Sequence, residues 1–256
     1  VSDSGGNRLL AAYSDGSAVL WQLRPVQLIH HFPPTGRESE IALTPDSALA
    51  IVEGPESADL SLWDTSTGRR LDVLKAPDEE RDKRIAALAM HPQGKCVAVL
   101  YHGREDCSPG RTMIWDLRAR RVMHQLTHTS SRRMAAIAFT PDGGRLVIGY
   151  YAGLNEQDEP WDRIEVWDWQ ASSRERGIRG SGFGATSLAI SRDGRCLLAR
   201  EGLCLAVRNL QTGELLARHS SQDKLLNAGV LAGDGKSIVG STFGNDLFRL
   251  MVADMA

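Results

Sequence analysis

Short apolar runs separated by polar turns dominate the hydrophobic pattern of the chain. Between residues 134 and 169, Met134 to Phe139 and Arg145 to Tyr150 are mainly apolar, and 163–169 begins with charged and apolar residues in alternation. Runs of this length, bounded by Pro, Gly and Asp, are typical of β-strands. No stretch of about 12 residues has a helical period, so the pattern predicts an all-β fold without a substantial helix.

A polar turn followed by an apolar run recurs six times. The six turns are Ser2-Asp3-Ser4-Gly5-Gly6, Thr44-Pro45-Asp46-Ser47, His91-Pro92-Gln93-Gly94, Thr140-Pro141-Asp142-Gly143, Ser191-Arg192-Asp193-Gly194 and Ala232-Gly233-Asp234-Gly235. From Asp3 to Asp234 the mean interval is about 46 residues, which fits a four-stranded propeller blade of about 40–45 residues. In the fourth copy, the segments 134–139, 145–150 and 163–169 are the first three strands, and the polar fourth strand is expected at the outer edge.

A second marker follows each turn at a similar distance. It reads Leu62-Trp63-Asp64, Ile114-Trp115-Asp116 and Val166-Trp167-Asp168, with a partial copy at Leu20-Trp21-Gln22 and diverged copies at Val207-Arg208-Asn209 and Leu250-Met251-Val252. A third marker, Thr67-Gly68 and Thr212-Gly213, lies at the same distance beyond the second in both copies that keep it. Because the three markers keep a fixed order, we interpret the repeat as structural, with Trp21, Trp63, Asp64, Trp115, Asp116, Trp167 and Asp168 as its repeat positions.

These residues carry a resemblance to the WD-repeat family of β-propellers, which is named for the Trp-Asp dipeptide. The resemblance covers essentially the whole chain as six repeats, at about 1–37, 38–84, 85–133, 134–183, 184–224 and 225–256. It implies one propeller domain of four-stranded antiparallel blades. The Gly-His pair frequent in the family is missing, and only Ser14-Asp15-Gly16 matches its Asp-bearing turn. We therefore expect apolar packing to hold most blades.

The two ends of the chain do not match a whole number of blades. Val1 fits only the tail of an innermost strand, and 8–14 is then the second strand of the first blade. The last repeat has three expected strands, 227–232, 237–242 and 247–252, without a fourth. We expect a segment of a longer protein, part of a seven-bladed ring. A six-bladed ring that closes imperfectly is the alternative.

Composition narrows the classes of function. The chain is 42% hydrophobic and 24% charged, as in ordinary globular proteins, and 30 basic and 32 acidic residues leave a net charge of −2. Such a balance gives no field for nucleic acid or an anionic membrane, so we expect neither as a partner. These 256 residues contain no signal-peptide pattern, and a free thiol at Cys107 suits a reducing compartment, which favours a cytoplasmic location. Because the N-terminus resembles a cut end, a signal removed with preceding residues is the alternative.

Two insertions on one propeller face are the candidate binding loops. They occupy residues 102–110 and 152–162, where the equivalent connection in the first repeat is little more than Asp15-Gly16. Binding residues tend to lie on such loops above a rigid scaffold. Trp161 is the best anchor candidate, although it could equally cover a blade edge. The candidate partner-binding residues are His102, Arg104, Glu105, Asp106, Arg132, Arg133, Asn155, Gln157, Asp158, Glu159 and Trp161.

Other charged segments have simpler interpretations. The mixed run 78–84 is nearly self-neutralising and is expected to be a solvated loop. On the opposite face, three hairpin turns are basic, and they either form a cationic strip for an acidic partner segment or are merely solvated. Their arginines are Arg69, Arg70, Arg118, Arg120, Arg121, Arg174 and Arg176.

Metal, cofactor and catalytic motifs are missing from the sequence. Cys96 and Cys196 occupy matching repeat positions, as small buried hydrophobes would, and no cysteine pair has zinc-ligand spacing. His128 is expected in packing or in solvent. Asp158 and Glu159 are too close in sequence, on a loop, to form a convincing acid–base pair. We expect no metal, no cofactor and no enzymatic activity.

The leading hypothesis is a non-catalytic interaction scaffold that offers a propeller face to a protein or peptide partner. The alternative is a sensor or regulatory domain of a larger multidomain protein, such as a nucleotide-hydrolysing switch or a kinase, whose other domains would be partners. A propeller enzyme with a site in its central channel is a third hypothesis. A metal or cofactor bound to the complete protein would support it.

Overall fold

The computed structural model describes residues 1–33, 40–54, 58–81, 83–102, 110–128, 134–151, 164–180, 184–220, 226–231, 236–242 and 247–251. In these ranges the chain forms six antiparallel sheets and one short 3-10 helix, η1 (Asp78–Glu80). Two compact units are present, Val1–Ser131 and Arg132–Ala256. None of the helices in the described part has the length and apolar character needed to cross a membrane.

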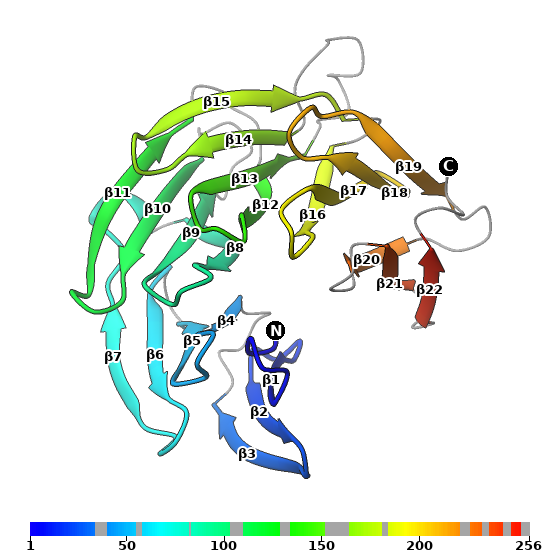
Figure 1. Cartoon of the computed structure of the whole chain (residues 1–256). Coiled ribbons are helices and arrows are strands. Elements are labelled where there is room, and N and C mark those ends of the chain that lie inside the picture. The colour runs from blue at the N-terminus through cyan, green and yellow to red at the C-terminus, as the bar shows by residue number, and fades with distance from the viewer. Residues whose placement is uncertain are drawn as a thin grey trace. The chain divides into compact units, whose positions relative to one another are not determined.

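The first unit contains three sheets, each built from consecutive strands joined by hairpins (Figure 1). The strands of the first sheet are β1 (Arg8–Ala12), β2 (Ala18–Leu23) and β3 (Val26–Phe32). Those of the second are β4 (Ile41–Leu43), β5 (Leu49–Glu53), β6 (Leu60–Asp64) and β7 (Arg70–Leu74). Those of the third are β8 (Arg84–Met90), β9 (Cys96–His102), β10 (Arg111–Asp116) and β11 (Arg121–Thr127).

The second unit repeats this design. Its first sheet contains β12 (Met134–Phe139), β13 (Arg145–Tyr150), β14 (Ile164–Asp168) and β15 (Ser173–Ile178). The next contains β16 (Ala185–Ile190), β17 (Cys196–Glu201), β18 (Cys204–Asn209) and β19 (Leu215–Ser220), and the last contains β20 (Leu226–Leu231), β21 (Ser237–Thr242) and β22 (Leu247–Met251). The all-β prediction and its four-stranded antiparallel blades are confirmed.

Burial explains why inner and outer strands read differently in the sequence. In β9, six consecutive residues from Cys96 to Tyr101 are buried, and Val97, Val99 and Tyr101 pack in one cluster with residues of the second sheet. In β11, exposed and partly buried residues alternate over the first five positions, since that strand is the outer edge of its sheet. A continuous apolar run therefore marks a central strand, and an alternating run marks an edge strand.

A one-residue bulge recurs where each outer strand pairs with its neighbour. The register shifts at Leu20/Trp21, Leu62/Trp63, Ile114/Trp115, Val166/Trp167 and Val207/Arg208. The residues left out of the ladder are Ile29, Leu71, Met123, Glu175 and Leu216. The bulge lies at the same register position in all five sheets, so these five residues occupy equivalent positions on the outer strands.

Apolar packing between successive sheets forms the core of each unit. In the first unit, Leu62 of the second sheet packs in one cluster with Val99 and Trp115 of the third. In the second unit, Val147 and Val166 pack in one cluster with Leu197. The sheets come so close that a Cβ on Gly149 of β13 would lie 2.5 Å from the carbonyl oxygen of Ala185 in β16. The apolar side chains of successive sheets thus bury one another, as predicted.

The first residues of the chain pair with β1. The Val1 amino group donates to the carbonyl oxygen of Leu10, and the Leu10 N–H donates to the carbonyl oxygen of Val1, both at 2.8 Å. Ser2 forms a bridge with Leu9. This pairing is the one expected for the tail of an innermost strand beside the second strand of a blade.

Candidate functional site

Most residues predicted to bind a partner lie outside the described part of the chain. They are Arg104, Glu105, Asp106, Arg132, Arg133, Asn155, Gln157, Asp158, Glu159 and Trp161. His102 is described: it ends β9, is partly buried and lies opposite Arg84 of β8 in the ladder. The loop site therefore stays a prediction.

The tryptophans of the repeat lie at one register position in four sheets, directly after the bulge. They are Trp21, Trp63, Trp115 and Trp167. The Trp63 ring packs 5.2 Å from the ring of Phe32 in the first sheet. The Trp167 indole N–H donates to Oε2 of Glu165 at 3.0 Å, and the Tyr150 hydroxyl donates to the same oxygen. Trp63 thus packs against a neighbouring sheet, and Trp167 shares an acceptor with Tyr150 of the adjacent strand.

The acidic residue after the tryptophan closes the next hairpin. Asp64 Oδ1 accepts from the backbone N–H groups of Ser66 at 2.7 Å and Thr67 at 2.9 Å. With the Ser66 hydroxyl as the largest contribution, these bonds lower the pKa of Asp64 to about 2. The same pair of backbone bonds forms at Asp116, Asp168 and Asn209. These side chains hold the outer hairpins in shape, and Asn209 does so in a repeat that lacks the dipeptide.

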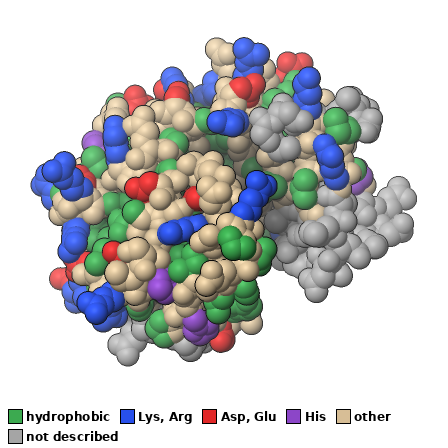
Figure 2. All heavy atoms as spheres, turned by 60° about the horizontal axis from the view of Figure 1, so that its bottom comes forward, with side chains coloured by type: hydrophobic (Ala, Val, Ile, Leu, Met, Phe, Trp, Pro, Cys, Tyr) green, Lys and Arg blue, Asp and Glu red, His purple; other side chains and the backbone are tan. Residues whose placement is uncertain are grey.

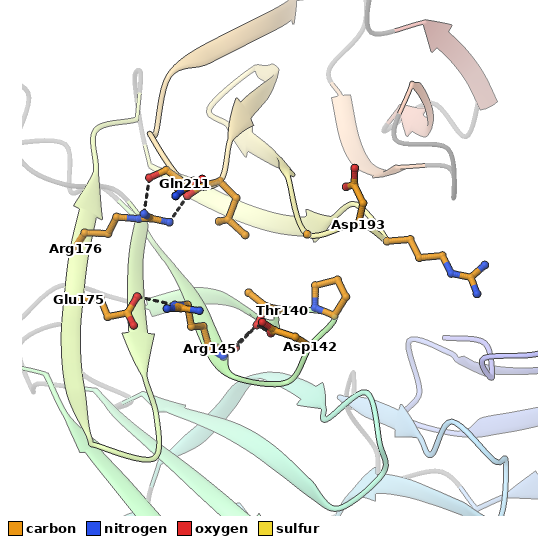
Figure 3. Close-up of a pocket in the computed structure, with 11 residues that line it drawn as sticks. Thr140, Asp142, Arg145, Glu175, Arg176, Asp193 and Gln211 are labelled. Atoms are coloured by element: carbon orange, nitrogen blue, oxygen red, sulfur yellow. Dashed lines mark hydrogen bonds and ion pairs between the residues drawn. The ribbon is translucent and has the colours of Figure 1, made fainter.

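A cleft of about 560 Å³ opens in the second unit between the sheet of β12–β15 and the sheet of β16–β19 (Figure 3). Its walls are the β12–β13, β16–β17 and β18–β19 turns, together with β13 and the outer strand β15. Among its lining residues are Thr140, Asp142, Arg145, Glu175, Arg176 and Gln211. The sequence signal for it is the polar turn marker itself, because two copies of that marker face each other here.

Five of the six charged residues that line this cleft have partners within the protein, and the sixth, Arg192, is exposed. Arg145 Nε donates to Glu175 Oε2 at 2.7 Å, and this hydrogen bond raises the pKa of the Arg145 guanidinium. The Arg176 guanidinium donates to the backbone carbonyl oxygens of Leu210 and Gln211, as Figure 3 shows. Burial lowers the pKa of Arg176. Arg145 thus links two strands of the fourth sheet, and Arg176 links that sheet to the β18–β19 turn of the fifth.

The arrangement of the cleft suits recognition better than reaction. Asp142 accepts from the Thr140 hydroxyl and from the Gly144 N–H, so its carboxylate is used by the turn. No described groups of three or more His, Cys, Asp or Glu are placed to hold a metal ion. What the cleft offers a ligand is a fixed set of hydrogen-bonding groups at its rim.

The charged run 78–84 is not simply a solvated loop, which corrects that prediction. Asp78–Glu80 form η1, and the Glu80 side chain is fully buried. Lys83 Nζ lies 3.0 Å from Glu80 Oε2, and Arg111 Nη1 lies 3.3 Å from Glu80 Oε1. The two cations compensate a carboxylate that lies out of water. The only sequence signal was the three-residue spacing of Glu80 and Lys83.

A second buried ion pair was missed by sequence reasoning. Arg208 stands at the tryptophan position of the fifth sheet, and its side chain is 8% exposed. It donates twice to the fully buried Glu201 carboxylate, from Nε to Oε1 at 2.7 Å and from Nη2 to Oε2 at 3.0 Å. Arg208 Nη1 also donates to the carbonyl oxygen of Gly213. The fifth repeat thus replaces an aromatic contact with a bidentate ion pair.

The side chains of Cys96, Cys196 and His128 are buried or partly buried. Burial raises the pKa of Cys96 to about 12, so its thiol stays protonated, and Cys196 is partly buried with its pKa raised by the same cause. His128 is 3% exposed, and its Nε2 lies 2.9 Å from the Thr112 hydroxyl oxygen. Burial lowers the pKa of His128 to about 4, so the ring is neutral at pH 7. Cys107 lies outside the described residues.

The whole chain is similar to a solved β-propeller. The crystal structure of the Cps50 (Swd1) β-propeller domain of Myceliophteria thermophila matches it with a TM-score of 0.78 and 16% sequence identity, over 100% of this chain and 83% of that one. No family model matches the sequence. No curated protein matches it either. A structural match of this extent shows that the chain has the β-propeller fold, as its repeats predicted.

Proposed function

We propose that this chain is a non-catalytic protein-interaction module of the WD-repeat type. The observation that carries the proposal is how the polar groups of the repeats are used. Aspartates and hydroxyls that recur in the turns bond to their own hairpins, as Asp64 and Asp142 do. In the described cleft, Arg145 pairs with Glu175, and Arg176 donates to backbone carbonyl oxygens. Side chains used in this way support a rigid scaffold for recognition, and none of these described groups is an activated nucleophile.

The partner is a protein or peptide, and the proposed contact is the face that bears the insertions at 102–110 and 152–162. Loops on a preordered scaffold bind at a low entropic cost, because little chain has to be fixed on association. Trp161 is the proposed anchor, and Arg104 is a second proposed contact. A cytoplasmic location belongs to the same proposal and is checked by cell fractionation.

The test compares a double variant on the loop face with a matched variant elsewhere. Trp161→Ala with Arg104→Ala is expected to weaken binding of the partner by at least about tenfold, as loss of an aromatic anchor does. Arg24→Ala with Val26→Ala, at exposed positions of the β2–β3 hairpin, is the control and should bind like the unchanged protein. The partner is identified by crosslinking and mass spectrometry, purified, and titrated calorimetrically. Unchanged affinity of the loop variant would refute the site.

A further inference from the structure

The first unit carries exposed apolar side chains at two adjacent bulges of its outer strands. Leu71 of β7 is 45% exposed, and Met123 of β11 is 41% exposed. Each is the residue that the bulge leaves out of the ladder, so the two hold equivalent places in neighbouring sheets. Large apolar side chains at equivalent exposed positions form a repeated feature and not a scatter of single residues.

The arginines of the three basic hairpin turns divide into two groups. Arg120 pairs with Asp72, Arg174 pairs with Glu165, and Arg176 is bonded to backbone carbonyl oxygens. The remaining four are exposed and make no side-chain hydrogen bond or ion pair within the described residues. They are Arg69, Arg70, Arg118 and Arg121, all in the first unit.

These four arginines are close in sequence to the two apolar bulges. Arg69 and Arg70 directly precede Leu71, and Arg121 lies two residues before Met123. The two hairpins are joined, because Arg120 Nη1 of the third sheet lies 2.6 Å from Asp72 Oδ2 of the second. Figure 2 shows Lys and Arg side chains along the left side of the view with hydrophobic side chains between them, on the side where Figure 1 has β7 and β11.

We propose that this surface, the arginine–apolar patch, binds an acidic peptide segment that carries large apolar side chains. The patch consists of Arg69, Arg70, Leu71, Arg118, Arg121 and Met123. Its charge is the reason for an acidic occupant: the carboxylates of Asp64 and Asp116 nearby accept backbone N–H groups of their own turns, and the arginines point their charge at solvent.

The apolar residues select a peptide over a nucleic acid or a membrane surface. A phosphate backbone needs cations alone, whereas Leu71 and Met123 are covered only by a partner that brings apolar side chains of its own. The chain as a whole has a net charge of −2, so it has no general attraction for polyanions. A local positive charge around apolar side chains, on a chain whose net charge is negative, therefore favours a protein segment as the partner of the patch.

The second unit provides matched positions without this chemistry. In the fifth sheet, Leu216 holds the bulge position and is 40% exposed, but Glu214 stands where Arg69 stands in the second sheet. In the fourth sheet the bulge residue is Glu175, which pairs with Arg145. Leu216 is therefore an internal control, with equal exposure and an acidic neighbour.

The experiment measures binding of a fluorescein-labelled glutamate-rich peptide containing leucines, by fluorescence anisotropy with the full chain. Arg69→Glu with Arg121→Glu is expected to weaken binding about tenfold or more, because each exposed ion pair contributes up to about fivefold. Leu71→Asp with Met123→Asp should weaken it to a similar extent, and Leu216→Asp should leave it unchanged. Added salt should weaken binding of the unchanged chain, since the arginines are exposed.

Several outcomes would overturn the proposal. The first is that the chain binds a peptide with lysine in place of glutamate as tightly as the glutamate-rich one. The second is that it binds a peptide with serine in place of leucine equally well. The third is that Leu216→Asp weakens peptide binding as much as the patch variants do. Tighter binding of single-stranded DNA or of phosphatidylserine vesicles, lost in the Arg69→Glu/Arg121→Glu variant, would assign the patch to a polyanion instead. Circular dichroism checks that each variant is folded. If Leu71→Asp with Met123→Asp does not fold, the result with Arg69→Glu and Arg121→Glu alone tests the proposal.

The patch shares no residue with the loop site of the proposed function. Trp161→Ala with Arg104→Ala should leave peptide binding at the patch unchanged. Loss of the peptide in that variant would count against the patch as an independent surface. Failure of the loop site would not affect the result with Arg69→Glu and Arg121→Glu.

Discussion

Replacing Arg208 by methionine should destabilise the second unit strongly. The substitution keeps much of the side-chain length but removes the guanidinium that donates to Glu201 at 2.7 and 3.0 Å. The Glu201 side chain is fully buried, so the variant leaves a carboxylate without its cation and without water. Breaking a buried pair on one side costs about 3–5 kcal/mol. In a chain of this size, that corresponds to a fall in melting temperature of at least about 6 °C.

The double variant Arg208→Met with Glu201→Leu separates the cost of an uncompensated charge from the loss of packing. With both charged groups gone, no buried charge is left uncompensated and only weaker neutral hydrogen bonds such as that of the Gly213 carbonyl oxygen are lost, so the free energy of unfolding should return to within about 2 kcal/mol of that of the unchanged protein. Urea denaturation followed by tryptophan fluorescence, together with calorimetry, measures all members of the cycle. If Arg208→Met costs less than about 1 kcal/mol, or if the two substitutions are additive, the buried pair does not act as argued.

Two further predictions concern sheet spacing and pH. Gly149→Ala should cost about 1–3 kcal/mol, because its Cβ would meet the Ala185 carbonyl oxygen at 2.5 Å, whereas Gly144→Ala in an exposed turn should be nearly neutral; equal melting temperatures would contradict the close approach. Because burial holds the pKa of His128 at about 4, below its usual 6.5, the unfolded chain takes up the proton first, and stability should fall as pH decreases from about 6.5 to about 4. His128→Gln, which can still bond to Thr112, should remove that part of the pH dependence in urea midpoints measured across this range, and an unchanged slope would show that His128 is not its source.

Local pattern was enough to predict the strands of the fourth repeat. The expected segments 134–139 and 145–150 agree with β12 and β13, and 163–169 contains β14. β12 and β13 pair through a short turn, so the signals for that hairpin lie within a few residues of one another, whereas β13 and β14 pair across a connection of 13 residues. The same locality explains why the turn aspartates could be recognised as a repeat before any contact was known.

Charged side chains were harder to interpret from sequence. The run 78–84 looked self-neutralising, yet Glu80 is buried between Lys83 and Arg111. Arg208 looked like decay of the repeat, yet it makes a bidentate pair with Glu201. In both cases the choice between solvent and burial depends on an element outside the local repeat motif.

The amino-acid sequence by itself determined the repeat length, the strand order and the hairpin turns, because these follow from alternation and turn residues over short distances. Only the tertiary structure decided which charges meet between sheets. Asp72 and Arg120 are 48 residues apart, and Arg176 reaches the carbonyl oxygen of Gln211 across 35 residues. Such contacts depend on how one sheet stacks on the next, which a local sequence pattern does not show.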